Sequence, residues 1–267
     1  MNTAHMEIVS AGTRALRRST IWWSVGIAVL TITTAGFWPS LEGSEALESF
    51  DDMGALLEAF GAQNLATPAG YLDGQMFAIM LPLLLSGMAI AGVTALTSGD
   101  EDAGRLEFLH ALPISRHAIW LGRWLAAMLM LVGVTAATSA IMVAFLPIFS
   151  LDGVSAWSVI AATIACALLA AFHAAVAFAA GALGSRRGTS VAIAVCVLVA
   201  GYVLGLLAPI AEGLPWTPKF SPWYWALGEQ PVSNGLQPNW LIVVVTLTIV
   251  LVGVGGRAIR HRDIRSA

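Results

Sequence analysis

Long apolar stretches, each bounded by charged residues, glycine or proline, dominate the hydrophobic pattern of the chain. A helix that spans a bilayer needs about 20 mainly apolar residues. Six stretches have approximately this length or more, and none of them contains an acidic residue. The pattern therefore predicts six transmembrane helices, at residues 20–38, 76–97, 118–146, 157–183, 189–210 and 240–256.

The segments outside these stretches carry patterns of their own. Residues 1–19 place apolar and basic side chains at helical spacing, which fits an amphipathic helix in the headgroup layer or a disordered basic anchor. In the loop at 39–75, apolar residues between Leu47 and Phe60 recur every three or four positions, which fits a short surface helix or a solvated acidic loop. The loop at 211–239 contains five prolines and an aromatic cluster. Because so many prolines forbid one continuous helix, we expect this loop to re-enter the membrane, with an interfacial aromatic belt as the alternative.

Composition supports a membrane protein and excludes several other classes. The chain is 58% hydrophobic and 11% charged, whereas soluble domains carry about 25% charged residues. A net charge of −3 and the lack of a Lys/Arg-rich block argue against nucleic acid as a partner. Cys166 and Cys196 lie inside apolar stretches, so they do not form a disulfide framework. The predicted fold is one all-α integral membrane domain over residues 1–267.

The distribution of cations predicts the orientation of the chain. Twelve of the thirteen cations fall on one side of the predicted spans, and only Lys219 falls on the other. Since Lys and Arg are retained on the cytoplasmic side, both termini are predicted to be cytoplasmic, in a prokaryotic-type plasma (inner) membrane. Arg17 and Arg18 before an apolar run also fit a twin-arginine export signal, but no clear cleavage site follows them.

The cytoplasmic loop between the second and third predicted spans has the most organised sequence. Ser98 and Glu101 have the spacing of a capping box, and Pro113 stops a helix. Leucines at steps of three give this predicted short helix an apolar ridge, at Leu106, Leu109 and Leu112. From the residues alone, the ridge fits either the lipid surface or a groove on a cytoplasmic partner.

This loop resembles the coupling segment of type-2 ABC transporter permeases. The matching residues are Glu101-x-x-Gly104-x-Leu106-Glu107-x-Leu109-x-x-x-Pro113-Ile114-Ser115-Arg116. The resemblance covers essentially the whole chain. Like members of the family, the chain has six predicted spans with both termini inside, a basic entry helix and two further motifs. Those motifs are Thr67-Pro68-x-Gly70-Tyr71 and Ser221-Pro222-Trp223-Tyr224. Arg105 and His110 depart from the usual Thr and aliphatic residue, which makes this segment more polar.

The resemblance implies that residues 99–116, here called the coupling segment, dock on a separate soluble nucleotide-binding ABC ATPase subunit. It also implies a second permease subunit, identical or related, beside this one in the membrane lipid. The residues that would transmit closure of the ATPase to the spans are Glu101, Gly104, Leu106, Glu107, Leu109, Pro113 and Arg116.

No candidate for catalysis by this chain itself emerges. A phosphate-binding Gly-x-x-x-x-Gly-Lys-Ser/Thr loop is missing, since the only lysine is Lys219. ATP and Mg²⁺ are therefore expected in the partner ATPase, with no cofactor in this chain. No Cys/His/carboxylate cluster has metal-ligand spacing. His173 is the ionisable residue at membrane depth, and we expect it to bond a neighbouring helix. An intramembrane protease would need a nucleophile such as Ser86 with a base.

Three further positions carry expectations about packing. Arg123 begins the third span, where its long stem is expected to snorkel to the headgroups. Pro82 should kink the second span. The small residues of Gly201-x-x-x-Gly205 allow close helix contact, first within the chain and second with a partner permease.

The leading functional expectation is the transmembrane subunit of an ATP-driven exporter of an amphipathic or lipophilic molecule, such as a drug, antibiotic, lipid or peptide. Two alternatives remain open. One is a non-transporting ABC membrane subunit that serves assembly or maturation. The other is an autonomous carrier or channel, against which the lack of mid-membrane charge pairs argues.

Overall fold

The computed structural model describes residues 3–41, 65, 67–106, 114–210, 216–228 and 230–262. All regular secondary structure in these ranges is helical, and six helical segments there are long and apolar enough to cross a membrane. The chain is thus a multi-pass, all-helical membrane protein. The elements are α1 (Thr3–Leu41), α4 (Pro68–Leu72), the π-helix η1 (Asp73–Phe77), α5 (Met80–Leu96), α6 (Ser98–Asp102), α8 (Arg116–Phe145), α9 (Ala156–Ala182), α10 (Arg187–Ile210), the 3₁₀ helix η2 (Thr217–Phe220), α11 (Pro222–Leu227) and α12 (Pro238–His261).

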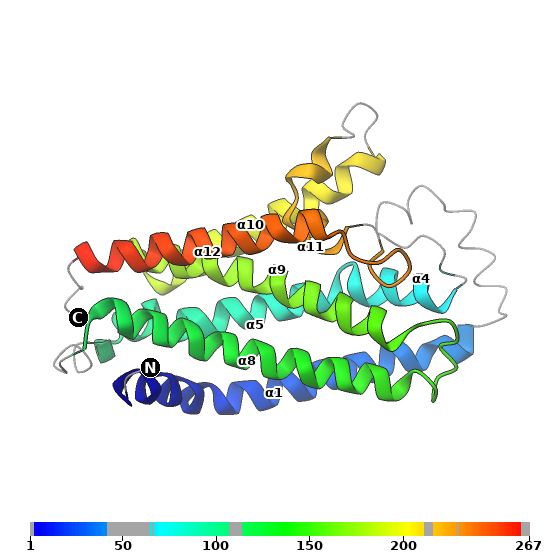
Figure 1. Ribbon diagram of the computed structural model, residues 1–267, viewed down its shortest axis with the longest axis horizontal. Coiled ribbons are helices and arrows are strands. Elements are labelled where there is room, and N and C mark those ends of the chain that lie inside the picture. The colour runs from blue at the N-terminus through cyan, green and yellow to red at the C-terminus, as the bar shows by residue number, and fades with distance from the viewer. Residues whose placement is uncertain are drawn as a thin grey trace.

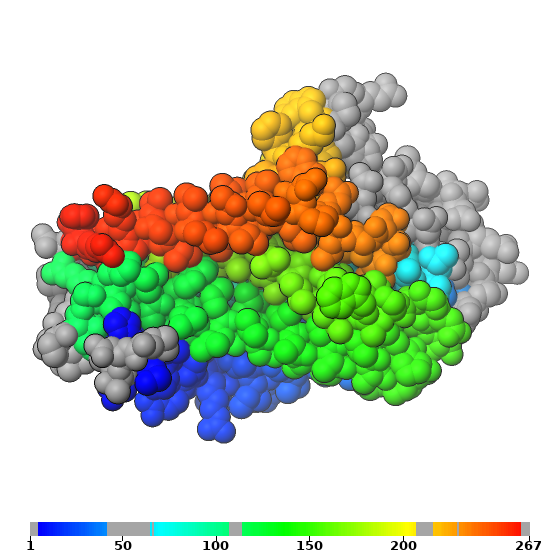
Figure 2. Space-filling view, in the orientation of Figure 1, coloured from blue at the N-terminus to red at the C-terminus, as the bar shows by residue number. Residues whose placement is uncertain are grey.

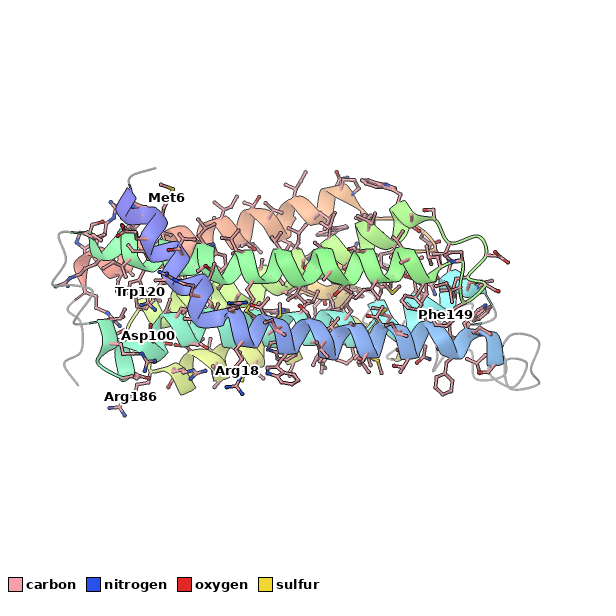
Figure 3. All side chains as sticks on the ribbon, turned by 90° about the horizontal axis from the view of Figure 1, so that it is seen from below. Met6, Arg18, Asp100, Trp120, Phe149 and Arg186 are labelled. Atoms are coloured by element: carbon pink, nitrogen blue, oxygen red, sulfur yellow. The ribbon has the colours of Figure 1, made fainter. Side chains whose placement is uncertain are left out.

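The long helices form one elongated bundle, and α1 begins at the end where α12 finishes (Figure 1). Asp100 of α6 and Arg186, directly before α10, lie at this same end, whereas Phe149 after α8 lies at the other (Figure 3). We call the first the basic end, because the arginines that flank α6, α8, α10 and α12 gather there, and the second the opposite end. The basic end is the one that the sequence analysis assigns to the cytoplasm.

Helix α9 lies at the centre of the bundle, in contact with α5, α8, α10 and α12. Most of its buried positions are alanine, and small residues let neighbouring helices approach closely. Glycine on α12 has the same effect, since a Cβ on Gly255 would lie 2.9 Å from the Phe178 ring. α1 packs mainly against α8, and α12 packs mainly against α9. The two helices line opposite edges of the bundle (Figure 2).

One continuous helix, α1, contains both the predicted interfacial segment and the first predicted span. It changes direction near Arg18 (Figure 3). Its first turns pack on α8, because a Cβ on Gly12 would lie 2.7 Å from Ala126 Cβ, and one on Gly122 would lie 2.7 Å from Ile8. The amphipathic start of the chain is therefore part of the bundle, and its apolar face covers small residues of α8.

The second spanning segment starts earlier than the sequence analysis expects, within the predicted loop 39–75. Thr67 caps it by accepting a hydrogen bond from Gly70 N (3.1 Å), and Pro68 occupies the first turn, both strong signals for a helix start. The predicted surface helix between Leu47 and Phe60 lies outside the described residues. The helices α8, α9 and α10 cover the next three predicted spans, and α12 continues past the predicted end of the sixth to His261.

The chain between α10 and α12 folds back along the bundle, and we call α11 the re-entrant helix for this reason. The entry of this loop into the membrane stays a prediction. Pro222 at the start of α11 lies beside Gly201, because a Cβ there would be 2.8 Å from Pro222 Cδ. Gly201 is more than two turns from the end of α10 at Ile210. α11 contacts α9, α10 and α12 and buries Trp223, whereas the last turns of α10 and η2 project from the side of the bundle (Figure 2).

Candidate functional site

Three acidic residues directly follow the second spanning helix, in α6 at the basic end. We call residues 100–102 the acidic turn. Asp100 and Glu101 are buried and Asp102 is exposed. The turn lies close to the start of α10, since a Cβ on Gly99 would lie 2.9 Å from Arg187 Cδ. A buried carboxylate is costly unless a charge or hydrogen-bond donor pairs with it, so the partners of the acidic turn define the site.

Asp100 pairs with Arg123, which α8 contributes from its second turn. The same guanidinium donates to the carbonyl oxygen of Leu96 at 2.7 Å, and Arg105 Nε donates to Asp100 from the other side, also at 2.7 Å. The Arg123 side chain is only 13% exposed. The snorkelling expected for Arg123 is therefore wrong: its charge turns inward, because Asp100 and a free helix-end carbonyl lie within its reach.

Glu101 is fully buried and pairs with Arg262, the residue that follows α12. Arg262 also donates through Nη1 to the carbonyl oxygen of Gly181 at the end of α9 (3.2 Å). The capping box expected for Ser98 and Glu101 does not form. Helix α6 is instead preceded by Thr97, which makes no side-chain cap, and the Glu101 carboxylate faces a different helix.

Arg116, at the far end of the coupling segment, binds the same residue. Its Nη1 donates to the carbonyl oxygen of Arg262 at 2.6 Å. Asp102 adds a contact with a third helix, because its carboxylate accepts the backbone N–H of Arg187 at 2.8 Å. The coupling segment is thus joined to α8 through Arg123, to α10 through Arg187 and to α12 through Arg262.

Of the other predicted transmission residues, the structure describes Gly104 and Leu106. Gly104 has a positive φ of 68°, a conformation that favours glycine and explains why this position suits it. Leu106 is fully buried in the chain, not on an exposed ridge as the leucine spacing suggested. Glu107, Leu109 and Pro113, which the resemblance also implies as transmission residues, lie outside the described residues.

Sequence reasoning missed the partners that complete this site. Asp100, Arg187 and Arg262 entered the sequence analysis only as charges on one side of the membrane, and Arg123 entered it as a snorkelling side chain. A usable indication was present, since three consecutive acids directly after a span are unusual on a side otherwise rich in arginine. Which arginine meets which acid depends on how the helices pack, and that is not written in any one segment.

A second polar contact lies within the bundle. Ser86 Oγ of α5 is 3.0 Å from His173 Nδ1 of α9, and both side chains are fully buried. This confirms that His173 bonds a neighbouring helix. The protease alternative gains no support, because His173 Nε2 has no hydrogen-bond partner among the described residues, whereas a catalytic triad orients that base with a carboxylate.

The opposite end is held together by the re-entrant helix and by a buried carboxylate. Trp223 Nε1 donates to the carbonyl oxygen of Ala78 at 2.9 Å, directly after the π-helix η1. Asp73, the first residue of η1, accepts hydrogen bonds from Val232 N (2.8 Å), Ser233 N (2.9 Å) and Ser233 Oγ (2.7 Å). The loop before α12 and the start of the second span are therefore fixed to each other.

Both motifs that the sequence analysis singled out at this end have packing roles. Tyr71 donates its hydroxyl to the carbonyl oxygen of Thr34 in α1 at 2.8 Å, downstream of the Thr67 cap. Ser221 caps α11 and donates to the carbonyl oxygen of Gly201 at 2.6 Å, and its Oγ is 3.5 Å from where a Cβ on Gly205 would lie. The paired glycines of α10 thus serve contacts within the chain.

The site at the basic end suits mechanical connection. Its groups are charge pairs and backbone hydrogen bonds that join α6 to α8, α10 and α12, and α12 to α9. Within the described ranges, no three His, Cys, Asp or Glu side chains lie close enough to hold a metal ion.

Comparison with known proteins identifies the family. A family model described as "Multidrug efflux system permease Rv1217c, C-terminal domain" matches residues 9–260, which includes all six spans, the acidic turn and the re-entrant helix. No individual curated protein matches the sequence. The chain therefore belongs to the family of the C-terminal domain of the multidrug efflux system permease Rv1217c.

Proposed function

We propose that this chain is the membrane-spanning subunit of an ATP-driven exporter that moves amphipathic or lipophilic molecules out of the cell. The observation that carries this proposal is the match of residues 9–260 to a multidrug efflux permease family. The resemblance of the coupling segment to that of type-2 ABC permeases adds the source of energy.

In this proposal the basic end faces the cytoplasm of a prokaryotic cell, and residues 99–116 dock on a separate ABC ATPase. That ATPase binds ATP and Mg²⁺, and a second permease subunit completes the transport unit. The ATPase biases an equilibrium between conformations of the spans. The contacts of the acidic turn with α8, α10 and α12 support this role, because they give the coupling segment a physical connection to three spanning helices.

Co-purification tests the partner. The tagged chain, extracted from its native membrane in mild detergent, is expected to bring a P-loop ATPase in about a one-to-one ratio, assigned by mass spectrometry. Leu109→Asp should abolish this association, because a charge on an apolar docking surface is costly to bury. Ile148→Asp is the matched control, since Ile148 is exposed at the opposite end and should leave the ATPase bound.

Transport tests the direction and the class of substrate. Inverted vesicles that contain the co-purified complex should accumulate ethidium, a lipophilic cation, only when ATP and Mg²⁺ are supplied. Stimulation of ATP hydrolysis by the dye separates an exporter from a non-transporting subunit. A chain that purifies alone and moves the dye without ATP would overturn the proposal in favour of an autonomous carrier.

A further inference from the structure

We propose that Arg262 is a positioning residue for energy coupling: it holds both ends of the coupling segment and so makes α12 move with that segment. This inference rests on the proposed function and deepens it. Neither the coupling-segment motif nor the family description points to a residue beyond the last span.

The geometry supports this role from two directions. Glu101, near the start of the coupling segment, pairs with the Arg262 side chain. Arg116, at the end of the coupling segment and the first residue of α8, donates to the Arg262 backbone carbonyl oxygen at 2.6 Å. One residue of a different helix thus contacts two positions that are 15 apart in sequence, one at each side of the segment proposed to dock.

The two contacts of the Arg262 side chain point in different directions, and this geometry suits arginine. Arg262 Nη2 meets Glu101 while Nη1 donates to the Gly181 carbonyl oxygen at 3.2 Å. A planar guanidinium supplies two such donors in fixed directions, whereas the lysine ammonium is a single flexible point. Arg262 therefore also fixes the end of α9 to the end of α12.

Burial makes this connection stiff. The Glu101 side chain is fully buried and that of Arg262 is 17% exposed, so water cannot easily replace either partner. Breaking a buried pair leaves an uncompensated charge. A displacement of the coupling segment that kept the Glu101–Arg262 pair intact would have to carry Arg262, and with it α12 and the end of α9, along the same path.

The position of α12 can be measured without any ATPase. Spin labels at Ala103→Cys and His261→Cys, two exposed positions on either side of the contact, report the distance between α6 and α12 by pulsed EPR. The background carries Cys196→Ala, since Cys196 is exposed and Cys166 is buried. The wild-type contact predicts one narrow distance distribution. Arg262→Gln should broaden it, and Arg262→Lys should broaden it less.

The second readout is the ratio of dye transported to ATP hydrolysed by the co-purified complex. Arg262→Gln should lower this ratio about tenfold, within the range for mutations along a coupling path, and the swap Glu101→Arg with Arg262→Glu should recover part of it. Arg257→Gln is the matched control, because Arg257 is an exposed arginine near the end of α12, five residues before Arg262. It should change neither readout.

The outcomes separate this inference from the proposed function. Wild-type protein without an associated ATPase would count against the proposed function before any variant is made. A narrow α6–α12 distribution in Arg262→Gln would overturn the inference. So would a broad one with an unchanged transport ratio, since Arg262 would then hold structure without serving coupling. Each variant is compared after elution at the wild-type volume in gel filtration, and Glu101→Gln, which keeps Arg262 intact, should reproduce the effect of Arg262→Gln.

Discussion

Asp73 shows how much a single side chain organises at the opposite end. It is 1% exposed and accepts three hydrogen bonds from Val232 and Ser233, which lie in the loop before α12. These bonds satisfy the buried backbone N–H of Val232, which would otherwise lack a partner, and also hold the partly buried N–H of Ser233. In the sequence, Asp73 is one of many acids in a region of outer loops, and nothing in its neighbours indicates a partner 160 positions away.

Replacing Asp73 with Asn should destabilise the protein. The amide keeps one acceptor but turns an NH₂ toward a backbone donor, and a hydrogen bond to a charged group contributes about 1.5–3 kcal/mol. We expect a lower unfolding temperature in detergent, measured by scanning fluorimetry. Asp152→Asn is the control, since Asp152 is exposed at the same end. Equal unfolding temperatures for the two variants would refute the role of Asp73.

At the scale of elements, α11 depends on a glycine in another helix. The backbone of α10 can meet Pro222 only where no Cβ intervenes, at Gly201, and Ser221 then reaches the Gly201 carbonyl oxygen. Through Trp223 the same short helix contacts the carbonyl oxygen of Ala78 between η1 and α5. The packing of α10 thus helps to decide where the second span is held near the opposite end.

Gly201→Ala is expected to displace α11. The added methyl would lie 2.8 Å from Pro222 Cδ, and overpacking of this kind costs about 1–3 kcal/mol. The unfolding temperature in detergent should fall, together with ATP-driven ethidium uptake. Gly253→Ala, where a Cβ meets nothing within 4 Å, should leave both unchanged or raise the stability slightly. If Gly201→Ala behaves like Gly253→Ala, α11 does not depend on this contact.

Features that depend on neighbouring residues could be predicted from the sequence, whereas contacts between separate helices could not. The spans follow from local hydropathy, and Thr67 with Pro68 marks a helix start within four residues, so such features can be read from a segment. The break between α10 and α12 was predictable because prolines forbid a continuous helix. Arg123 was misplaced because its partner Asp100 lies on another helix, and pairing between helices depends on their relative positions.

At the scale of the whole molecule, the two ends of the bundle differ in chemistry. Arginines and the acidic turn occupy one end, and aromatic residues with the re-entrant helix occupy the other. Retention of arginine in the cytoplasm would place α1's start and α12's end inside the cell. This orientation also puts the Arg262 contacts on the side where ATP is available.

Cysteine labelling tests the orientation. In a Cys196→Ala background, a membrane-impermeant maleimide should modify Asp152→Cys in intact cells. His261→Cys should react only after the membrane is permeabilised. Both positions are exposed in the chain, so accessibility to water decides the result. Labelling of His261→Cys in intact cells would reverse the predicted topology.

The alanine-rich α9 has a consequence for how the bundle moves. Nine of the seventeen buried residues of α9 are alanine. Alanine has no side-chain rotamers, so a helix packed on these positions meets no α9 side chain that must re-order when the helix shifts. Sliding of packed helices past one another is one of the common modes of conformational change. The four long helices that pack on α9 are α5, α8, α10 and α12. At the alanine positions they can change their relative heights by shear along α9, while the Ser86–His173 contact and the polar contacts at both ends of the bundle limit how far they slide.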